Sequence, residues 1–306
     1  VKLDGKQWVL RRPPPGDLPP GANDMAREYL ILRNLYRAYP LAPRAIHFSE
    51  DKSVLGAPFL LMEYRPGLVI GGRLPDARAT TTQERSRLGL QMVEQLANLH
   101  AVDTGAVGLN MLGRPEGMLQ RMVAGWNKRA ELACSRTARD TPAGIARVHA
   151  WLRAHQVPDR APRLLHSDFK LDNIILDPET LRPRTLIDWD MGTLGDPLYD
   201  LAVLLSYWSE SADPPVMHDL RQMPTAGYGF ASRAEAAALY ARLSGRSLGD
   251  FTFFRVLATL RIAVVFRQLH QRNSLAEVKD PRAAGFDALA EGLLAFGMQV
   301  ARGRYF

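Results

Sequence analysis

One stretch, residues 164–190, limits what this chain can fold into more than any other. It contains the pattern H-x-D-x-K-x-x-N, which ends at Asn173, and Asp188 follows fifteen residues later. Two short apolar runs, 174–176 and 185–187, lie between these two residues and flank a turn containing Pro and charged residues. Such runs predict a β-hairpin. The hairpin would bring Asn173 and Asp188 together at one end.

The polar residues of this stretch suit a phosphoryl transfer that is assisted by Mg²⁺. Such a transfer depends mainly on positioning and on neutralisation of charge. Asp168 is expected to accept the proton of a substrate hydroxyl, and Lys170 to contact the γ-phosphate. Asn173 and Asp188 offer the hard oxygen ligands that Mg²⁺ prefers. His166 is expected to support the loop. The alternative is a hairpin with solvated carboxylates.

The stretch resembles the catalytic and metal loops of the aminoglycoside phosphotransferase and choline kinase superfamily, which is related to the protein kinases. The string LIDWDMGTLGDPLYDLAVLL is most similar to one branch of it, which includes the kinase domains of some acyl-CoA dehydrogenase family members. The similarity covers nearly the whole chain. Ser167 stands where that branch usually has Gly, and Asp190 where it usually has Glu. Neither change removes a metal ligand.

The resemblance also implies supporting roles for acidic residues beside the metal loop. Asp190 is expected to lie next to the metal ligands without being one. Asp196 and Asp200 stand where apolar core residues would be expected. They are expected to anchor the catalytic loop, through its backbone N–H groups or through His166.

The resemblance implies an α+β, bilobal fold of the protein-kinase type, with a small antiparallel β-sheet lobe and a large, mainly helical lobe. We expect residues 1–66 to form the small lobe and hinge, and residues 67–306 to form the large lobe with the catalytic loop, metal loop and acceptor site. Apolar periodicity supports this division. Besides the hairpin, it predicts strands at 6–12, 45–48 and 58–63, and helices at 24–38, 82–100, 119–133, 143–155, 198–208, 233–243, 251–271 and 281–303.

The small lobe holds the residues expected to bind ATP. Kinases place a Lys on a strand of this lobe to contact the α- and β-phosphates. The first predicted strand puts Arg11 in that position, or Arg12 if the register differs by one. Glu28, one turn into the next helix, is expected to pair with this cation. Backbone groups near Glu63 and Tyr64 resemble the hinge that binds adenine. The alternatives are a surface arginine and a solvated glutamate.

A glycine-rich strand-turn-strand covers the phosphates in kinases, and the chain has none before Trp8. The chain also lacks an initiator Met, so we expect the native protein to extend upstream. With Arg11 in the Lys position, this absence leaves open a pseudokinase or nucleotide sensor without transfer. The retained Asp168, Asn173 and Asp188 oppose that alternative. A protein kinase is less favoured, because no A-P-E sequence follows the metal loop.

Composition narrows the classes of partner. The net charge of +7 and the pI near 9.7 favour anionic partners. The basic residues are scattered and no RNA-recognition or zinc signature accompanies them, so nucleic acid is not expected. The sequence has no run of 18 or more apolar residues, so no membrane helix is predicted, and no signal peptide is evident. The single cysteine, Cys134, suits a reducing cytoplasm. The oligomeric state is open.

The acceptor is expected to be a small hydroxylated molecule. Sites for polycationic aminoglycosides gather acidic side chains, but residues 201–306 contain 12 Arg and Lys against 9 Asp and Glu. Arg261, in an apolar context, is the best candidate to face an anion in the site. A neutral or anionic acceptor is therefore favoured, and the resemblance suggests a hydroxyacyl-CoA. A choline-like cation would require an aromatic cage, for which Tyr207, Trp208 and Tyr228 are the candidates.

Overall fold

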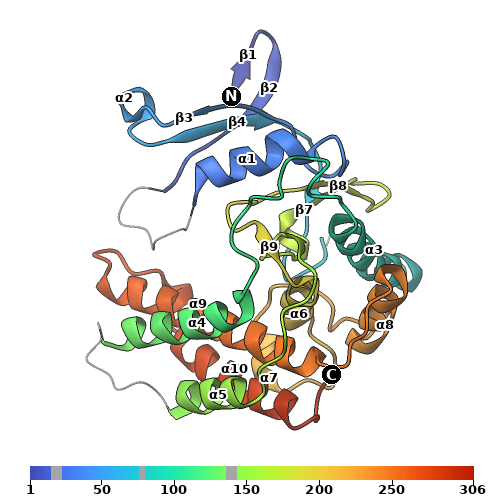
Figure 1. Cartoon of the computed structure of the whole chain (residues 1–306), viewed down its shortest axis with the longest axis vertical. Helices are drawn as coiled ribbons and strands as arrows, with labels where there is room; N and C mark the ends of the chain where they lie inside the picture. The colour runs from blue at the N-terminus through green and yellow to red at the C-terminus, as the bar shows by residue number, and fades with distance from the viewer. Residues whose placement is uncertain (15–22, 76–79, 136–142) are drawn as a thin grey trace.

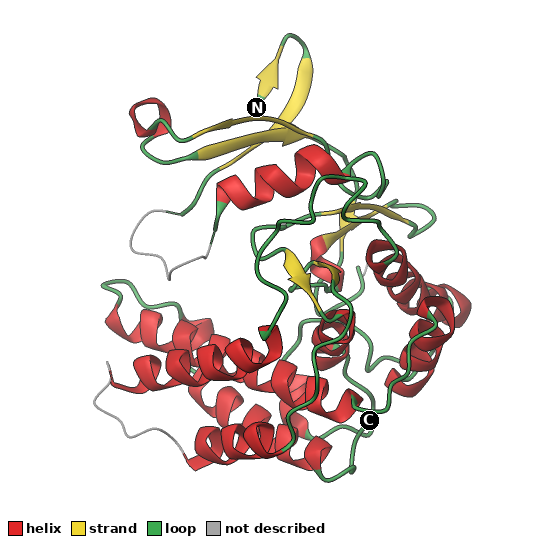
Figure 2. Cartoon of the chain, in the orientation of Figure 1, coloured by secondary structure: helices red, strands yellow, loops and turns green. Residues whose placement is uncertain are grey.

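The computed structural model describes residues 1–14, 23–75, 80–135 and 143–306. They form two lobes, a small one built around a four-stranded sheet and a large one made mainly of helices (Figures 1 and 2). The expected α+β, protein-kinase-like architecture is confirmed. None of the described helices is long and apolar enough to cross a membrane.

The small lobe is built on a four-stranded antiparallel sheet. Its strands are β1 (Lys2–Leu3), β2 (Lys6–Arg11), β3 (Ala45–Ser49) and β4 (Phe59–Glu63), in the order β1-β2-β4-β3. The predicted β2, β3 and β4 are present. β1 was not predicted, because two residues are too few to show an alternating pattern. A turn with positive φ at Asp4 and Gly5 joins it to β2.

One helix, α1 (Met25–Leu35), packs against this sheet. It begins where predicted, since the side chain of Asp24 accepts a hydrogen bond from the backbone N–H of Arg27, which satisfies a free donor of the first turn. Its buried face contains Ile31 and Leu32 together with the carboxyl group of Glu28. A shorter helix, α2 (Lys52–Leu55), lies between β3 and β4.

The predicted hairpin is confirmed and belongs to a three-stranded sheet. Its strands are β7 (Ile174–Leu176) and β8 (Pro183–Leu186), and β5 (Leu68–Val69) pairs with the outer side of β7. The backbone N–H of Ile187 donates to the carbonyl of Asn173 over 2.9 Å. Asn173 and Asp188 therefore lie at the same end of the hairpin. A second pair, β6 (Arg163–Leu165) and β9 (Thr193–Gly195), flanks the catalytic loop.

Four helices of the large lobe pack around α9, whose buried residues fall on every side of its first four turns. It packs against α4, α5, α6 and α10, as an all-round apolar helix must. The large-lobe helices are α3 (Thr82–His100), α4 (Met118–Ser135), α5 (Ala143–Ala154), α6 (Pro197–Tyr207), α7 (Pro215–Asp219), α8 (Arg233–Ser244), α9 (Phe251–Leu275) and α10 (Phe286–Ala301).

The predicted helix at 281–303 begins later than expected. Residues Pro281–Ala283 form a separate 3-10 turn, capped by the side chain of Asp280, and α10 starts at Phe286 after Gly285. A proline begins a helical turn as readily as a long helix, so the pattern did not distinguish the two.

As for the lobes, β4 ends at Glu63 and β5 already pairs within the large lobe. We propose that the boundary lies near residue 66.

Candidate active site

The catalytic loop between β6 and β7 is attached to α6 by one buried carboxylate. Asp200 accepts hydrogen bonds from the backbone N–H groups of His166, over 2.6 Å, and Ser167, over 2.8 Å. Ser167 has a φ of 68°, a conformation that favours glycine. This geometry gives a physical reason for the Gly that the resembling branch carries at this position. The expected contact between Asp200 and the loop is present.

The imidazole of His166 joins the catalytic loop to the metal loop. Its Nε2 lies 2.9 Å from the carbonyl oxygen of Ile187, and its Nδ1 lies 3.3 Å from the backbone nitrogen of Asp168. An N–H at Nε2 and an acceptor at Nδ1 satisfy both contacts, so we assign the neutral Nε2–H tautomer. The ring is buried against Trp189. His166 thus holds two loops in register, as a supporting residue would.

Asp168 stands at the centre of the loop and is held by charged and polar groups. One carboxylate oxygen lies 2.8 Å from Nη2 of Arg261 and 3.1 Å from the hydroxyl of Tyr207. The other accepts a hydrogen bond from the amide of Asn173 over 3.2 Å and lies 3.7 Å from Nζ of Lys170. Burial by itself would raise the pKa of Asp168, but Arg261 and Lys170 outweigh it and lower the pKa to about 2.

Arg261 has a different partner from the one expected. The sequence suggested that it would face an anionic substrate, but the anion that it meets is the carboxylate of Asp168. Its other terminal nitrogen, Nη1, donates to the Tyr207 hydroxyl over 3.0 Å, and this contact is buried. The residues are 93 positions apart in the chain. Local pattern reading therefore could not connect them.

Lys170 lies beside Asp168, because residues two apart on an extended backbone face the same side. Its φ and ψ of −156° and 167° are those of a strand. The ammonium group is 3.1 Å from Asp172 and 5.5 Å from the centre of the Tyr207 ring. Burial opposes its charge, but Asp168, then Tyr207 and Asp172, favour it, so the pKa of Lys170 is raised and the side chain stays cationic.

The two expected metal ligands lie next to a cluster of carboxylates around Arg11. Asn173 donates from Nδ2 to the backbone carbonyl of Asp168 over 2.9 Å, which leaves its carbonyl oxygen as the atom for a cation. Asp188 contacts Nη2 of Arg11. Glu28 lies 3.0 Å from Nη1 of the same guanidinium, and Asp190 lies 4.0 Å from Nη2.

Negative charge exceeds positive charge in this cluster. Burial raises the pKa of Glu28 to about 7; Arg11 lowers it, and Asp188 and Asp190 raise it further. Burial and then Asp188 also raise the pKa of Asp190. The described residues contain no group of three His, Cys, Asp or Glu side chains that could hold a metal. Two protein oxygens and phosphate match the few protein ligands typical of Mg²⁺.

The cation of the small lobe is Arg11 in this structure. Its side chain forms the expected ion pair with Glu28. The alternative, Arg12, donates instead to the carbonyl of Leu55 in α2 over 2.7 Å and is exposed. Arg12 lies just past the end of β2, and although it also lines the cavity between the lobes, its guanidinium has no described contact with Glu28.

The remaining supporting residues are divided between two places. Asp190 accepts a hydrogen bond from the backbone N–H of Asn23 over 2.8 Å, which links the metal loop to the start of α1. Asp196 accepts from the backbone N–H of Leu198 over 2.9 Å and caps α6. The expected hydrogen bond from Asp196 to the catalytic loop is not among the described contacts; its other neighbour is Arg160, 3.9 Å away.

A cavity of about 470 Å³ lies between the lobes, where adenine was expected. Val9, Met62, Ile175 and Ile187 contribute apolar walls from both lobes, and Arg11, Glu28, Glu63, Tyr64 and Asp188 also line it. Thr185, which lines it as well, has a buried hydroxyl oxygen without a hydrogen-bond partner. Glu63 accepts from Nη2 of Arg65 over 2.9 Å and from the backbone of Arg44 over 3.1 Å, so its side chain orders the hinge.

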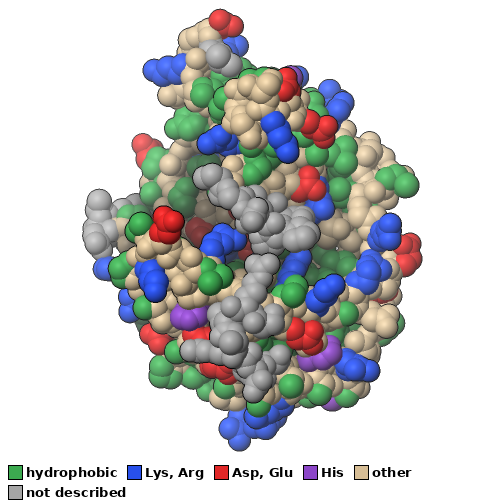
Figure 3. Space-filling view, turned by 90° about the vertical axis from the view of Figure 1, so that its left-hand side faces the viewer, with side chains coloured by type: hydrophobic (Ala, Val, Ile, Leu, Met, Phe, Trp, Pro, Cys, Tyr) green, Lys and Arg blue, Asp and Glu red, His purple; other side chains and the backbone are tan. Residues whose placement is uncertain are grey.

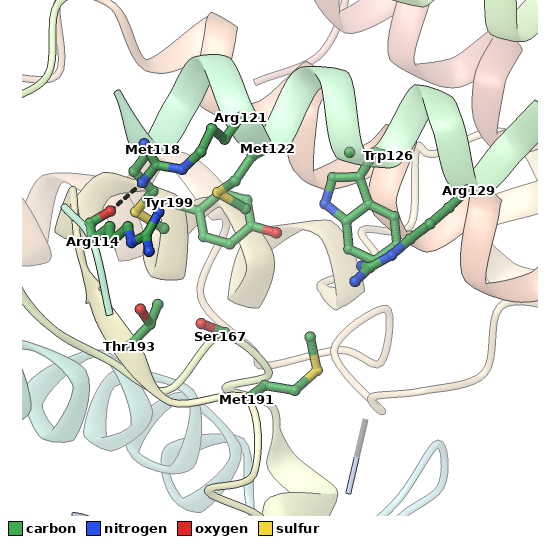
Figure 4. A pocket seen from close by; sticks show the side chains of 11 residues that line it. Arg114, Met118, Arg121, Met122, Trp126, Arg129, Ser167, Met191, Thr193 and Tyr199 are labelled. Carbon is green, nitrogen blue, oxygen red and sulfur yellow. Dashed lines mark hydrogen bonds between the residues drawn. The ribbon is translucent and has the colours of Figure 1, made fainter. Parts of the chain in front are cut away.

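A second cavity, of about 340 Å³, adjoins the catalytic loop and was not predicted. Figure 4 shows its wall of α4 side chains on one side and Ser167, Met191 and Thr193 on the other. Three arginines line it: Arg114, Arg121 and Arg129. A signal was present in the sequence. Arg121 and Arg129 are eight residues apart, and this spacing places them on one face of a helix.

Together, the bilobal fold, the aspartate in the loop and the Arg–Glu pair define a kinase-like phosphotransferase class. A comparison with family models agrees: residues 1–244 match the model described as "Phosphotransferase enzyme family". The chain belongs to this family.

The curated relatives are longer proteins, and this chain matches one part of each. The chain is 28% identical over 295 residues to acyl-CoA dehydrogenase family member 10 of Mus musculus, covering 96% of this chain and 27% of that protein. It is 30% identical over 301 residues to family member 11 of Pongo abelii, covering 96% of this chain and 37% of that protein. The chain thus spans only about a third of the length of these relatives.

Solved structures share the fold. A candidate aminoglycoside phosphotransferase from Ralstonia eutropha superposes with a TM-score of 0.80 at 24% identity, covering 98% of this chain and 87% of that one. A thermostable mutant of aminoglycoside phosphotransferase APH(4)-Ia, solved with AMP-PNP and hygromycin B, gives 0.60 at 17% identity, covering 98% and 89%. At these identities the likeness establishes the fold. With the family match, it supports a small-molecule phosphotransferase.

An expected result follows for the carboxylate that attaches the catalytic loop. Asp200→Asn replaces one of two acceptor oxygens with an N–H₂ group that opposes a backbone donor. We expect it to lower the free energy of unfolding by about 1–3 kcal/mol, as measured by urea denaturation. Asp196→Asn is the matched control, because Asn caps a helix about as well as Asp. Equal losses in both variants would contradict this assignment.

Proposed function

We propose that the chain transfers the γ-phosphate of ATP, with Mg²⁺, to a hydroxyl group of a small molecule. One observation carries the proposal: the Asp168 carboxylate is hydrogen-bonded to Asn173, while Asp188 joins the Arg11–Glu28 pair at the mouth of the cavity between the lobes. The residues proposed as base, metal ligands and phosphate-binding cation thus form two contacting groups, which the backbone hydrogen bond from Ile187 to Asn173 brings to one end of the hairpin.

Each side chain has a task in this proposal. Adenine would lie in the apolar part of the cavity between the lobes, with the phosphates directed at Arg11. Asn173 and Asp188 would hold Mg²⁺, which neutralises charge on the phosphates. Asp168 orients the acceptor hydroxyl and takes its proton as the oxygen bonds to the γ-phosphorus and the bond to ADP breaks. Lys170 remains charged beside Asp168 and would contact the transferred phosphoryl group.

A pKa near 2 makes Asp168 a weak base, and this fits the chemistry. In a loose transition state the attacking hydroxyl loses its proton late, so orientation matters more than basicity. The hydrogen bonds from Arg261, Tyr207 and Asn173 fix the carboxylate in place. Arg261 and then Lys170 lower the pKa of this carboxyl group and keep it ionised throughout the neutral pH range.

The acceptor proposed is neutral or anionic, for example a hydroxyacyl-CoA, which the resemblance suggested. The aromatic residues considered for a choline cage do not form one. Trp208 is buried with its Nε1 bonded to the carbonyl of Ala231, Tyr228 is 83% exposed, and the Tyr207 hydroxyl contacts Asp168.

On the face drawn in Figure 3, acidic and basic side chains are interspersed. We retain the predictions that neither nucleic acid nor membrane is a partner, and that the protein is cytoplasmic.

The proposal predicts that ATP stabilises the protein only with Mg²⁺. At about 100 times its dissociation constant, a ligand adds about 2.7 kcal/mol to the free energy of unfolding, which raises the melting temperature. Asp188→Ala should remove the Mg²⁺-dependent part of this shift. The measurement is thermal denaturation with ATP, with and without Mg²⁺. A pseudokinase would bind ATP but leave every hydroxylated acceptor unphosphorylated. An unchanged Mg²⁺ dependence in the variant would place the metal elsewhere.

A further inference from the structure

We propose that the cavity beside Ser167 binds the acceptor, and that Arg114, Arg121 and Arg129 hold a phosphate or carboxylate group of it. The inference rests on the proposed function, because it assigns the second substrate of that reaction. It adds the class of molecule, a hydroxylated amphiphile with an anionic end, and the residues that select it.

The cavity opens next to the reacting carboxylate. Ser167 precedes Asp168 in the loop, and both Ser167 and Met191 line the cavity. The sulfur of Met191 is 4.0 Å from Nη2 of Arg261, and the same nitrogen is 2.8 Å from Asp168. The cavity between the lobes has none of these lining residues. A molecule in this cavity would therefore approach Asp168 from a side distinct from that of the nucleotide.

The charge of the lining has one sign. Among the residues that the structure describes, three arginines contribute to it and no Asp or Glu does. Among the described residues, none of the three guanidinium groups has a carboxylate within ion-pair distance. The guanidinium of Arg129 lies 4.6 Å from the centre of the Trp126 ring, and Arg121 donates to the backbone carbonyls of Glu116 and Arg114. A cavity lined by cations without counter-charges favours an anion.

Arg114 and Arg121 are exposed and Arg129 is half-buried, but two of the guanidinium groups are held in place. The ring of Trp126 limits the position of the Arg129 guanidinium, and the two carbonyls limit that of Arg121, without neutralising either. Arginine held in this way is suited to bidentate recognition of phosphate or carboxylate. Between Arg121 and Arg129 the helix carries Gly125, and a Cβ added there would meet no atom within 4 Å. The helix thus leaves space between its two basic side chains.

An apolar stripe runs beside the basic one. Met118, Met122 and Trp126 recur at four-residue steps along α4, so they share a face, and they line the same cavity (Figure 4). Met191 faces them from the metal loop. Methionine side chains adapt to flexible apolar ligands. The acceptor therefore combines an anionic end, an apolar stretch and a hydroxyl. A polycationic aminoglycoside does not have this chemistry.

The test uses four probes that share a chain and a hydroxyl but differ at the far end: ω-hydroxydecanoate, hydroxydecyl phosphate, decanediol and aminodecanol. Binding is measured by calorimetry on the whole chain without nucleotide. We expect either or both anionic probes to bind at least about tenfold more tightly than the diol, and the amine to bind most weakly. The two anionic probes distinguish carboxylate from phosphate. Equal affinities across the set, or no binding of any probe, would overturn the proposal.

Two kinds of variant separate charge from shape. Arg121→Gln and Arg129→Gln should each weaken the anionic probes about tenfold and leave the diol unchanged. Gly125→Leu should weaken anionic probes and diol alike, while the better helix former maintains the stability of α4. Arg242→Gln, an exposed change of equal charge on α8, is the control. An effect of Arg242→Gln as large as that of Arg121→Gln would mean that only net charge matters, and would overturn the assignment.

The outcome for this cavity is independent of the outcome for the proposed function. If ATP gives no Mg²⁺-dependent shift but the anionic probes bind with the expected preference, the reaction is wrong and the anion-binding cavity stands. If ATP binds with Mg²⁺ but the probes do not discriminate by charge, the phosphotransferase stands and the acceptor class is wrong.

Discussion

Replacing Asp168 with Asn is expected to lower kcat by about 10²–10⁴-fold, the usual contribution of a positioned general base. The amide keeps the size of the side chain and cannot accept the hydroxyl proton. ATP binding should stay within about threefold of the original, because the cavity between the lobes does not include Asp168. Single-turnover measurement of ADP formation, with a hydroxylated acceptor, gives kcat for the chemical step.

The same substitution affects stability, and this effect has to be separated from catalysis. Asp168 is the carboxylate partner of Arg261, whose side chain is only 4% exposed. Breaking such a pair leaves a buried charge and costs about 3 kcal/mol. Urea denaturation of Asp168→Asn measures this loss, and kcat is then taken at a temperature where the variant is folded.

Asp172→Asn is the matched control for Asp168→Asn. Asp172 accepts from the same Lys170, over 3.1 Å, and has no described contact with Arg261. Its substitution should lower kcat less than about tenfold, because it removes a neighbour of Lys170 and leaves the proposed base in place. Comparable activity of Asp168→Asn and the original chain would remove Asp168 from the role of base. Transfer would then require another acceptor for the hydroxyl proton.

The parts of the site that the sequence predicted are those that depend on neighbours along the chain. The gap between Asn173 and Asp188 has the length of a hairpin, and the hairpin formed with Ile174 opposite Leu186. The position of Glu28 follows from the cap at Asp24, which sets the first turn of α1. In both cases a local rule, pleat or helical turn, determines which side chains meet.

The parts that were missed depend on packing between distant elements. Arg261 lies on α9 and Asp168 on the catalytic loop, and only the packing of α9 against α6 brings them together. The apolar context of Arg261 indicated an inward position but could not show which loop this arginine would meet. The arginines of α4 were equally visible as a stripe, but the cavity that they line exists only once the metal loop lies opposite. Charge counting over 201–306 therefore pointed to Arg261 on α9, whereas the proposed anion-binding arginines lie on or just before α4, outside the counted segment.

Replacing Arg261 with Met should change the pH dependence of the reaction as well as its rate. Burial raises the pKa of Asp168, and Arg261 is the largest of the effects that lower it to about 2. Without Arg261 the burial effect remains, so the pKa of Asp168 rises. The variant should show a loss of kcat on the acid side of neutrality that the original chain lacks. Lower kcat at every pH, by about 100-fold, is expected from misplacement of the carboxylate.

The sign of the stability change follows from the same pKa. In the folded chain the pKa of Asp168 lies below the ordinary value of 3.8, so its ionisation stabilises the fold above about pH 4. This contribution declines as the pH falls through about 2. Arg261→Met removes it, and the difference in unfolding free energy between the two proteins should therefore be larger at pH 7 than at pH 3.

Two variants test whether Arg261 acts through Asp168. Arg261→Lys keeps the charge but not the planar fork, so it should restore most of the flat pH profile and only part of kcat. Arg255→Met removes another buried arginine of α9, one that contacts Ser206 and the carbonyl of Phe306 instead of Asp168. It is expected to lower stability without adding an acid limb. If Arg261→Met and Arg255→Met gave the same pH profile, Arg261 would be a packing residue, and the low pKa of Asp168 would have to come from Lys170.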